Sequence, residues 1–372
     1  MTDTETRLRD YLQTKAATVP DDAEPPGLDE PVARRRIWPV LAAAATIAAV
    51  VAVPVVSKLT AEPPAVEPAA KPGLRVPYAV MANPVTLHDG DVTLPLDDTM
   101  TSFRDSARVD GGWVILHQDK ESRTYRLGLL RPTGDLTPFG PGEARGFEVS
   151  PDHRQVVTAT SAGGGRTRLV TLDIATGNEV NSLVVPYGSI TPRGWNSDGV
   201  WLIEEYSSKV PPVLWKPGTD QFTQLQVDDY AANLFVGTAS DRVMAVTQKG
   251  STTCLRAGTA RDGQLAVDAE YCAPATERRY AGFSPDGATI VNLDHRVAVT
   301  GGRTTKLALP AGALVGPPVF EDATHLLATL DGKPAGHLGS VQEVFYRCDV
   351  TRGACEAVYT APADTWVRLG QP

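Results

Sequence analysis

The chain has 372 residues, with 35 lysines and arginines, 44 aspartates and glutamates and a formal net charge of −9 at pH 7. This acidic balance, with an isoelectric point near 5.2, argues against nucleic acid as a partner of the main part of the chain. The 33 glycines and 30 prolines are typical of turn-rich β structure.

Residues 1–36 predict a short amphipathic helix followed by an acidic, Pro-rich spacer. The sequence TDTE at residues 2–5 reads as a capping box at the start of the helix. Leu8, Tyr11 and Leu12 follow at a spacing that places them on one apolar face. An isolated helix of ~15 residues is only marginally stable in water, so we expect this face to dock onto a partner. The surplus of acidic side chains favours a protein partner over anionic lipid.

Residues 37–56 predict a transmembrane helix. They form 20 consecutive residues without a charge, enough to span a hydrocarbon core of ~30 Å. Arg34, Arg35 and Arg36 directly precede them, and the positive-inside rule then places residues 1–36 in the cytoplasm. A cleaved signal peptide is the alternative, but the apolar segment is longer than the usual ~7–15 residues. The favoured location is therefore the cell membrane, with a single pass and an extracytoplasmic C-terminal domain.

Residues 57–75 predict an extended stalk. Four prolines in this segment favour a semi-rigid polyproline-II conformation that acts as a spacer.

From residue 76 onward, a glycine-centred turn recurs about every 44 residues. A period of this length indicates an array of one supersecondary unit, and four strands per ~40–45 residues is the length of a propeller blade. The glycines are Gly90, Gly134, Gly177, Gly218, Gly263, Gly302 and Gly353.

A second turn, rich in Asp, alternates with the first. An apolar, β-branched stretch follows each of these turns and predicts a short buried strand. Each unit therefore reads as strand, Asp turn, strand, loop, strand, Gly turn, strand. The aspartates are Asp110, Asp152, Asp198, Asp241, Asp286 and Asp322.

The pattern resembles the WD40-like and TolB-like propeller repeats of bacterial proteins, in which an S-P-D-G turn joins the two inner strands. Residues 284–287 match that turn fully, and residues 150–153 match it in part. The resemblance covers roughly residues 76–370 and implies an all-β propeller. It implies little about function, because propellers host many unrelated activities.

The ends of the repeat region predict how the ring closes. The hairpin around Gly90 precedes the first full unit, and residues 365–369 follow the last one. We expect both to form one composite blade, which removes the free sheet edges. Residues 76–372 are thus predicted to be a seven-bladed β-propeller, with six blades plus an extra hairpin as the alternative.

The four cysteines predict two disulfides. Cys254 and Cys272 are centred on the turn at Gly263, and Cys348 and Cys355 lie on either side of the last Gly turn. Each pair would face across two antiparallel strands at a Cα distance that suits an S–S bond. Such bonds persist in oxidising compartments, in agreement with an extracytoplasmic domain. A zinc site is the competing interpretation, but no C-x-x-C spacing supports it.

No catalytic, metal-binding or cofactor-binding motif is present, so we predict no cofactor, no metal ligand and no catalytic residue. His117 and Asp119 close a predicted strand and can line a central funnel, although surface exposure explains them equally well. Gly163-Gly164-Gly165 runs into a strand rather than a helix, which favours an inter-strand loop over a phosphate site.

Three functions from different classes fit these features. The favoured one is a non-catalytic, membrane-anchored module that binds or senses an envelope ligand or protein. The second is a transmembrane regulator whose cytoplasmic helix binds a sigma factor. The architecture resembles membrane proteins of high-GC Gram-positive bacteria, some of which act with extracytoplasmic-function sigma factors. The tail has no His and no Cys, so the zinc motif of the best-known anti-sigma family is absent. The third is an envelope hydrolase that gathers carboxylates from several blades.

Overall fold

The computed structural model describes residues 73–96, 100–204, 210–276, 280–331, 342–363 and 365–371. The predicted cytoplasmic helix with Leu8, Tyr11 and Leu12, the Arg34 to Arg36 cluster, the apolar segment 37–56 and the stalk as far as residue 72 lie outside these ranges. Within these ranges, the chain contains no helix long and apolar enough to cross a membrane.

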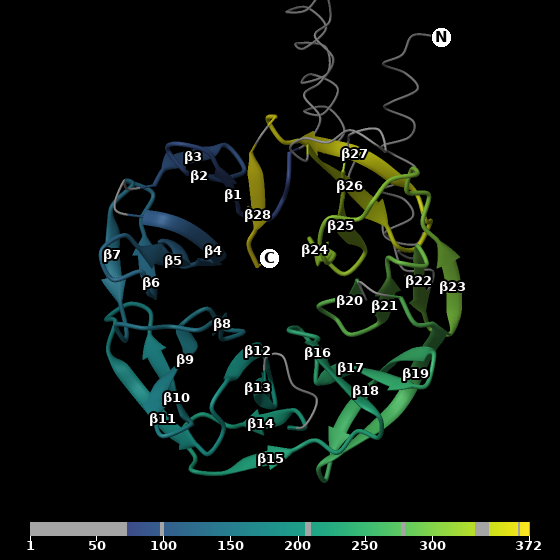
Figure 1. The fold of residues 1–372 in the computed structure, drawn as a ribbon, viewed down its shortest axis with the longest axis horizontal. Helices are drawn as coiled ribbons and strands as arrows, with labels where there is room; N and C mark the ends of the chain where they lie inside the picture. The colour runs from purple at the N-terminus through teal and green to yellow at the C-terminus, as the bar shows by residue number, and fades with distance from the viewer. Residues whose placement is uncertain are drawn as a thin grey trace, which may run out of the picture. The chain divides into compact units, whose positions relative to one another are not determined.

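Seven four-stranded antiparallel sheets form a ring in the part of the chain that the structure describes (Figure 1). The innermost strands are β28 (Trp366–Leu369), β4 (Met100–Val109), β8 (Phe147–Val149), β12 (Ile190–Asn196), β16 (Tyr230–Val236), β20 (Ala281–Phe283) and β24 (Val319–Phe320). The second strands are β1 (Tyr78–Met81), β5 (Gly112–Asp119), β9 (Gln155–Gly163), β13 (Gly199–Glu204), β17 (Arg242–Lys249), β21 (Thr289–Asn292) and β25 (His325–Asp331).

Two more strands complete each blade. The third strands are β2 (Thr86–Asp89), β6 (Tyr125–Leu130), β10 (Arg166–Asp173), β14 (Val213–Trp215), β18 (Thr252–Arg261), β22 (Val297–Thr300) and β26 (Glu343–Asp349). The outermost strands are β3 (Val92–Pro95), β7 (Leu136–Phe139), β11 (Glu179–Val185), β15 (Phe222–Gln224), β19 (Gln264–Pro274), β23 (Arg303–Lys306) and β27 (Cys355–Thr360). We number the blades from one, which contains β28 and β1 to β3, to seven, which contains β24 to β27.

The ring closes as the sequence predicts. β28 pairs antiparallel with β1, from Tyr78 opposite Leu369 to Met81 opposite Trp366. Blade one therefore combines the last strand with the first three, which leaves no unpaired inner strand at the seam. The seven-bladed prediction is confirmed, and the six-bladed alternative is wrong, because the hairpin around Gly90 belongs to a complete four-stranded blade.

The core consists of apolar layers between successive blades. In β5, Trp113 and Ile115 pack with blade one, whereas Val114 and Leu116 pack with blade three. Alternate side chains point to opposite faces of a strand, so a blade buried on both faces needs an uninterrupted apolar strand. This explains the continuous apolar runs that follow the Asp turns.

Two of the Asp turns have the same hydrogen-bond pattern. Ser284 Oγ donates to Asp286 Oδ1 at 2.5 Å and accepts from the Thr289 backbone nitrogen at 2.9 Å. Ser150 makes the same two bonds, to Asp152 at 2.6 Å and from Gln155 at 2.9 Å. These aspartates therefore hold turns between the inner strands, as expected from their tendency to bond nearby backbone.

The recurring Gly turns also connect neighbouring blades. Gly353, with φ +75°, accepts a 2.7 Å hydrogen bond from the Ala308 backbone nitrogen of blade six. Gly263 likewise accepts a 2.7 Å bond from the Gln226 nitrogen, which follows the last strand of blade four. These two glycines combine a positive φ with a close approach to another backbone, and glycine meets both requirements without a steric penalty.

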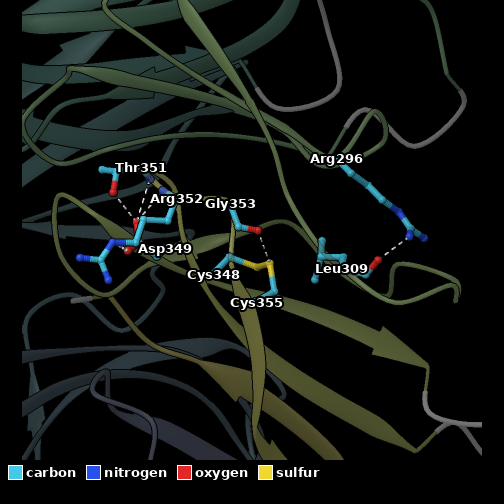
Figure 2. The surroundings of a disulfide bond; sticks show 8 residues. All are labelled: Arg296, Leu309, Cys348, Asp349, Thr351, Arg352, Gly353 and Cys355. Carbon is cyan, nitrogen blue, oxygen red and sulfur yellow. Dashed lines mark hydrogen bonds and ion pairs between the residues drawn. A yellow bond between two sulfur atoms is a disulfide. The ribbon is translucent and has the colours of Figure 1, made fainter.

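Both predicted disulfides are present. Cys254 and Cys272 lie opposite each other on β18 and β19, with Cα atoms 4.1 Å apart. Cys348 and Cys355 lie opposite each other on β26 and β27, with Cα atoms 4.0 Å apart (Figure 2). Each bond joins the two outer strands of one blade, at the rim of the ring.

Candidate functional site

A cavity of about 490 Å³ occupies the central channel. Residues from all seven innermost strands line it, so it exists only in the closed ring. The channel end beside the Asp turns is its Asp-turn end. The innermost strands begin at the opposite end of the channel, where the exposed side chain of Trp366 lies at the start of β28. One wall of the cavity is charged, and the facing wall is mostly apolar.

Two arginines of the charged wall lie on β-bulges. In β4, Phe103 pairs with His117 and Asp105 with Leu116, which leaves Arg104 as an extra residue. In β12, Pro192 pairs with Leu202 and Gly194 with Trp201, which leaves Arg193 as an extra residue. A bulge bends the strand and redirects the side chain, and bulges are frequent beside functional sites.

A register shift in β16 lies next to the bulge at Arg193. In β16 the register shifts between Tyr230 and Leu234, and Asn233 lies within this stretch. Asn233 Oδ1 accepts a 3.4 Å hydrogen bond from Arg193, whose guanidinium carbon lies 6.0 Å from the Phe235 ring centroid. A Cβ on Gly194 would lie 2.4 Å from Val236, so glycine lets blades four and five pack closely next to Arg193.

Asp105 lies beside Arg104 and has polar partners. Its carboxylate accepts hydrogen bonds from Gln371 Nε2 at 3.0 Å and from the Ser106 backbone nitrogen at 2.8 Å. Burial raises the pKa of Asp105 to about 6, and these hydrogen bonds and the charges of Arg104 and Arg193 only partly oppose the rise. Gln371 also donates to the Phe147 carbonyl oxygen at 3.1 Å, which connects β4 to β8.

Glu148 lies on β8, between the blades that carry the two bulged arginines. Burial and the nearby Asp105 raise the pKa of Glu148 to about 8, whereas Arg193 acts in the opposite direction. At neutral pH the carboxyl group is therefore mainly protonated, and it can donate a hydrogen bond into the cavity.

The facing wall is mostly apolar. Its apolar side chains come from blades five, six and seven, and Thr329 and Glu343 of blade seven are polar exceptions. Its apolar residues are Leu234, Phe235 and Val236 of β16, Phe283 of β20, Val315, Pro317, Pro318 and Val319 at the start of blade seven, and Phe345 of β26.

The residues singled out from the sequence lie elsewhere. The cysteines are at the rim, and the aspartates of the Asp turns do not line the cavity. His117 is buried in β5 and does not line the channel either, contrary to the funnel interpretation. Gly163 to Gly165 form the turn between β9 and β10, as the loop interpretation expects.

The described residues offer little to a metal ion. Their one cluster of three metal-ligating side chains consists of Cys254, Glu270 and Cys272. Both sulfurs of this cluster belong to a disulfide, so neither is a thiolate ligand.

Sequence reasoning missed Arg104, Asp105, Glu148 and Arg193. A bulge is defined by the strand opposite, so no local pattern marks Arg104 or Arg193. The one available signal was a charged residue in the stretch just before an Asp turn, where a buried innermost strand is expected to be apolar.

The fold and the site define the chain as a seven-bladed β-propeller with a ligand-sized, charged channel. No protein-family model matches the sequence, and no curated protein sequence does. Among solved structures, the chain is similar to TolB from Acinetobacter baumannii, with 13% identity, coverage of 82% of this chain and 66% of that chain, and a TM-score of 0.45.

Two further solved structures are similar at the same level. One is a prolyl endopeptidase, with 12% identity, coverage of 73% of this chain and 50% of that chain, and a TM-score of 0.46. The other is the Dos1 propeller, with 12% identity, coverage of 75% and 78%, and a TM-score of 0.46. The chain thus spans just under two thirds of the TolB chain, and it spans half of the endopeptidase chain. The propeller assignment depends on the strand pairing described above and not on these similarities.

Proposed function

We propose that the protein is a non-catalytic binding module whose central channel holds its ligand. The observation that carries this proposal is the pair of bulged arginines, Arg104 and Arg193, on either side of Glu148. Both bulges interrupt regular strand pairing, and both place an arginine in the lining of one cavity. The cavity volume falls within the range of ligand pockets, ~300–1,000 Å³.

We further propose that the module works in the cell envelope. Residues 37–56 would anchor it with the N-terminus inside, and Arg34, Arg35 and Arg36 would set that orientation. Two disulfides without a free cysteine among the described residues support an oxidising compartment. The ligand would then be an envelope molecule or a protein segment.

The test is native mass spectrometry of the full-length protein in lipid nanodiscs, after incubation with small-molecule and peptide extracts of its own cells. A bound species that is lost in Glu148→Leu and retained in Glu179→Leu supports the channel as the site. Glu179 is the matched control, because its side chain is exposed and pairs with Arg168 on the outer strands. No bound species, or equal binding by both variants, contradicts the proposal.

The helix predicted from residues 1–36 supports a separate proposal. Leu8, Tyr11 and Leu12 would bind a cytoplasmic protein, with a sigma factor as the candidate. Replacing Leu8 and Leu12 with Asp should abolish capture of a sigma factor by the full-length membrane protein. Unchanged capture, or capture of no sigma factor by the wild type, contradicts this regulatory role.

An envelope hydrolase is the third candidate, because the ring brings two carboxyl groups from adjacent blades into one cavity. Asp105 and Glu148 both have raised pKa values, and general acids are commonly tuned in this way. Against it, Asp105 is already bonded to Gln371 and Ser106, and an apolar wall faces the pair. Turnover of a glycoside or peptide panel that disappears in Glu148→Gln would favour the hydrolase over the binding module.

A further inference from the structure

We propose that the channel binds an amphipathic monocarboxylate, with its carboxylate at the wall of Arg104, Glu148 and Arg193 and its apolar group against Phe235 and Phe283. This inference rests on the proposed binding function and names the chemical class of the ligand. Each part of it follows from a different property of the cavity.

Arg193 is the reason to expect a negative charge on the ligand. Its side chain is exposed and lines the channel. Among the described residues it forms no ion pair within 4.0 Å, although its charge acts against the raised pKa values of Asp105 and Glu148. Its contacts there are the weak hydrogen bond to Asn233 and the ring of Phe235. A guanidinium has five N–H donors in a planar fork that matches a carboxylate, so most of its bonding capacity is available to a ligand.

The neighbouring carboxyl groups are the reason to expect only one negative charge on the ligand. Arg104, Arg193 and Arg368 line the cavity together with Asp105, Glu148 and Glu343, and burial raises the pKa of each of these three acids. Because Glu148 is mainly protonated at neutral pH, the three acids do not fully cancel the charge of the three arginines, and Glu148 can donate to a carboxylate oxygen. The excess of positive charge is small, so it favours a ligand with one carboxylate over a ligand with two.

The apolar part follows from the opposite wall. Phe235 and Phe283 face the cavity with Pro318 and Val319, and none of these side chains can satisfy a polar group. A ligand that left polar atoms against this wall would lose their hydration without compensation. The same wall explains why a free small anion such as acetate would bind weakly, since it would leave the apolar surface wet.

The experiment measures binding of four probes to the full-length protein in nanodiscs by calorimetry, with empty nanodiscs subtracted. The probes are 3-phenylpropionate, its amide, 3-phenylpropylamine and acetate. We expect 3-phenylpropionate to bind at least tenfold more tightly than each of the others. Arg193→Gln should weaken its binding at least tenfold, and Arg193→Lys should weaken it less, because the charge remains and the fork is lost.

Arg168→Gln is the matched control, because Arg168 pairs with Glu179 outside the channel, and it should leave binding unchanged. Equal or tighter binding of the amide or amine overturns the proposal, as does unchanged binding by a folded Arg193→Gln or Arg193→Lys protein. If a channel ligand recovered from cells lacks a carboxylate, this inference fails and the binding function stands. If neither an extract ligand nor any probe binds, both fail.

Discussion

Arg347 Nη2 donates a 2.9 Å hydrogen bond to Glu321 Oε1, and the two side chains are only 4% and 0% exposed. Arg347 also donates to the Gly73 carbonyl oxygen at 2.8 Å, and Glu321 accepts from the Arg75 backbone nitrogen at 2.7 Å. This buried pair therefore ties the first described residues to blade seven, at the Asp-turn end of the ring and next to the seam. Arg75 reinforces the attachment with a 3.2 Å ion pair to Asp322.

Breaking this pair should destabilise the ring strongly. Arg347→Met leaves the Glu321 carboxylate buried without its partner, which costs about 3–5 kcal/mol in comparable pairs. The measurement is the denaturant midpoint of unfolding. Arg168→Met is the control, because the Arg168–Glu179 pair is 40% exposed on each side and should contribute less than about 1 kcal/mol. Similar losses in the two variants would contradict the structural role assigned to the buried pair.

Gly353 and Gly302 occupy equivalent turns but should tolerate alanine differently. Both have positive φ, +75° and +77°, so either substitution costs about 1 kcal/mol in backbone strain. At Gly353 the new Cβ would also lie 2.2 Å from the Lys306 carbonyl oxygen of the neighbouring blade, whereas nothing lies within 4 Å at Gly302. Thermal unfolding should therefore rank Gly353→Ala clearly below Gly302→Ala, and the reverse order would be inconsistent with the inter-blade contact.

The two disulfides should differ in their response to reductant. Cys272 is exposed, whereas Cys348 is fully buried, so we expect the Cys254–Cys272 bond to be reduced first. Differential alkylation followed by peptide mass spectrometry gives the order. Removing the Cys254–Cys272 bond, with a sequence separation of 18, should cost about 3 kcal/mol in loop-closure entropy. Earlier reduction of Cys348–Cys355 would contradict the predicted order.

Stability should fall as the pH rises through the range set by Glu148 and Asp105. Burial raises the pKa of Glu148 from 4.5 to about 8, so the folded state binds more protons than the unfolded state between these values. Raising the pH therefore favours unfolding, and the contribution is complete below about pH 4.5 and lost above about pH 8. The melting temperature should drop from pH 5 to pH 8.5 in the wild type and drop less in Glu148→Gln. An equal drop in that variant and in the exposed control Glu179→Gln would contradict this origin.

The N-terminal segment should behave as an uncleaved anchor. Full-length protein should stay with membranes after an alkaline carbonate wash, and deletion of residues 2–56 should release it, because the charge-free span is lost. N-terminal peptide mass spectrometry of the membrane form checks for the intact tail. A mature protein that begins after residue 56 would support the signal-peptide alternative instead.

Much of the fold could be read from local chemistry. Gly353 and Asp286 lie in turns because those turns need a positive φ and a side chain that bonds nearby backbone. Cys348 and Cys355 could be paired because a turn centred between two residues of a hairpin places them opposite each other. The blade count followed from the repeat, and the composite blade followed from the need to pair free strand edges.

The binding site had a different origin. Asp105, Glu148 and Arg193 are far apart along the chain, and each has ordinary neighbours in sequence, so only ring closure brings them together. Arg104 and Arg193 are candidate binding residues because they lie on bulges beside the channel. These bulges depend on how β4 pairs with β5 and how β12 pairs with β13. By itself the sequence determined the blade, its turns and its disulfides, because these depend on short-range backbone geometry. Only the tertiary structure decided the charged channel, because it depends on the register of paired strands and on burial within the closed ring.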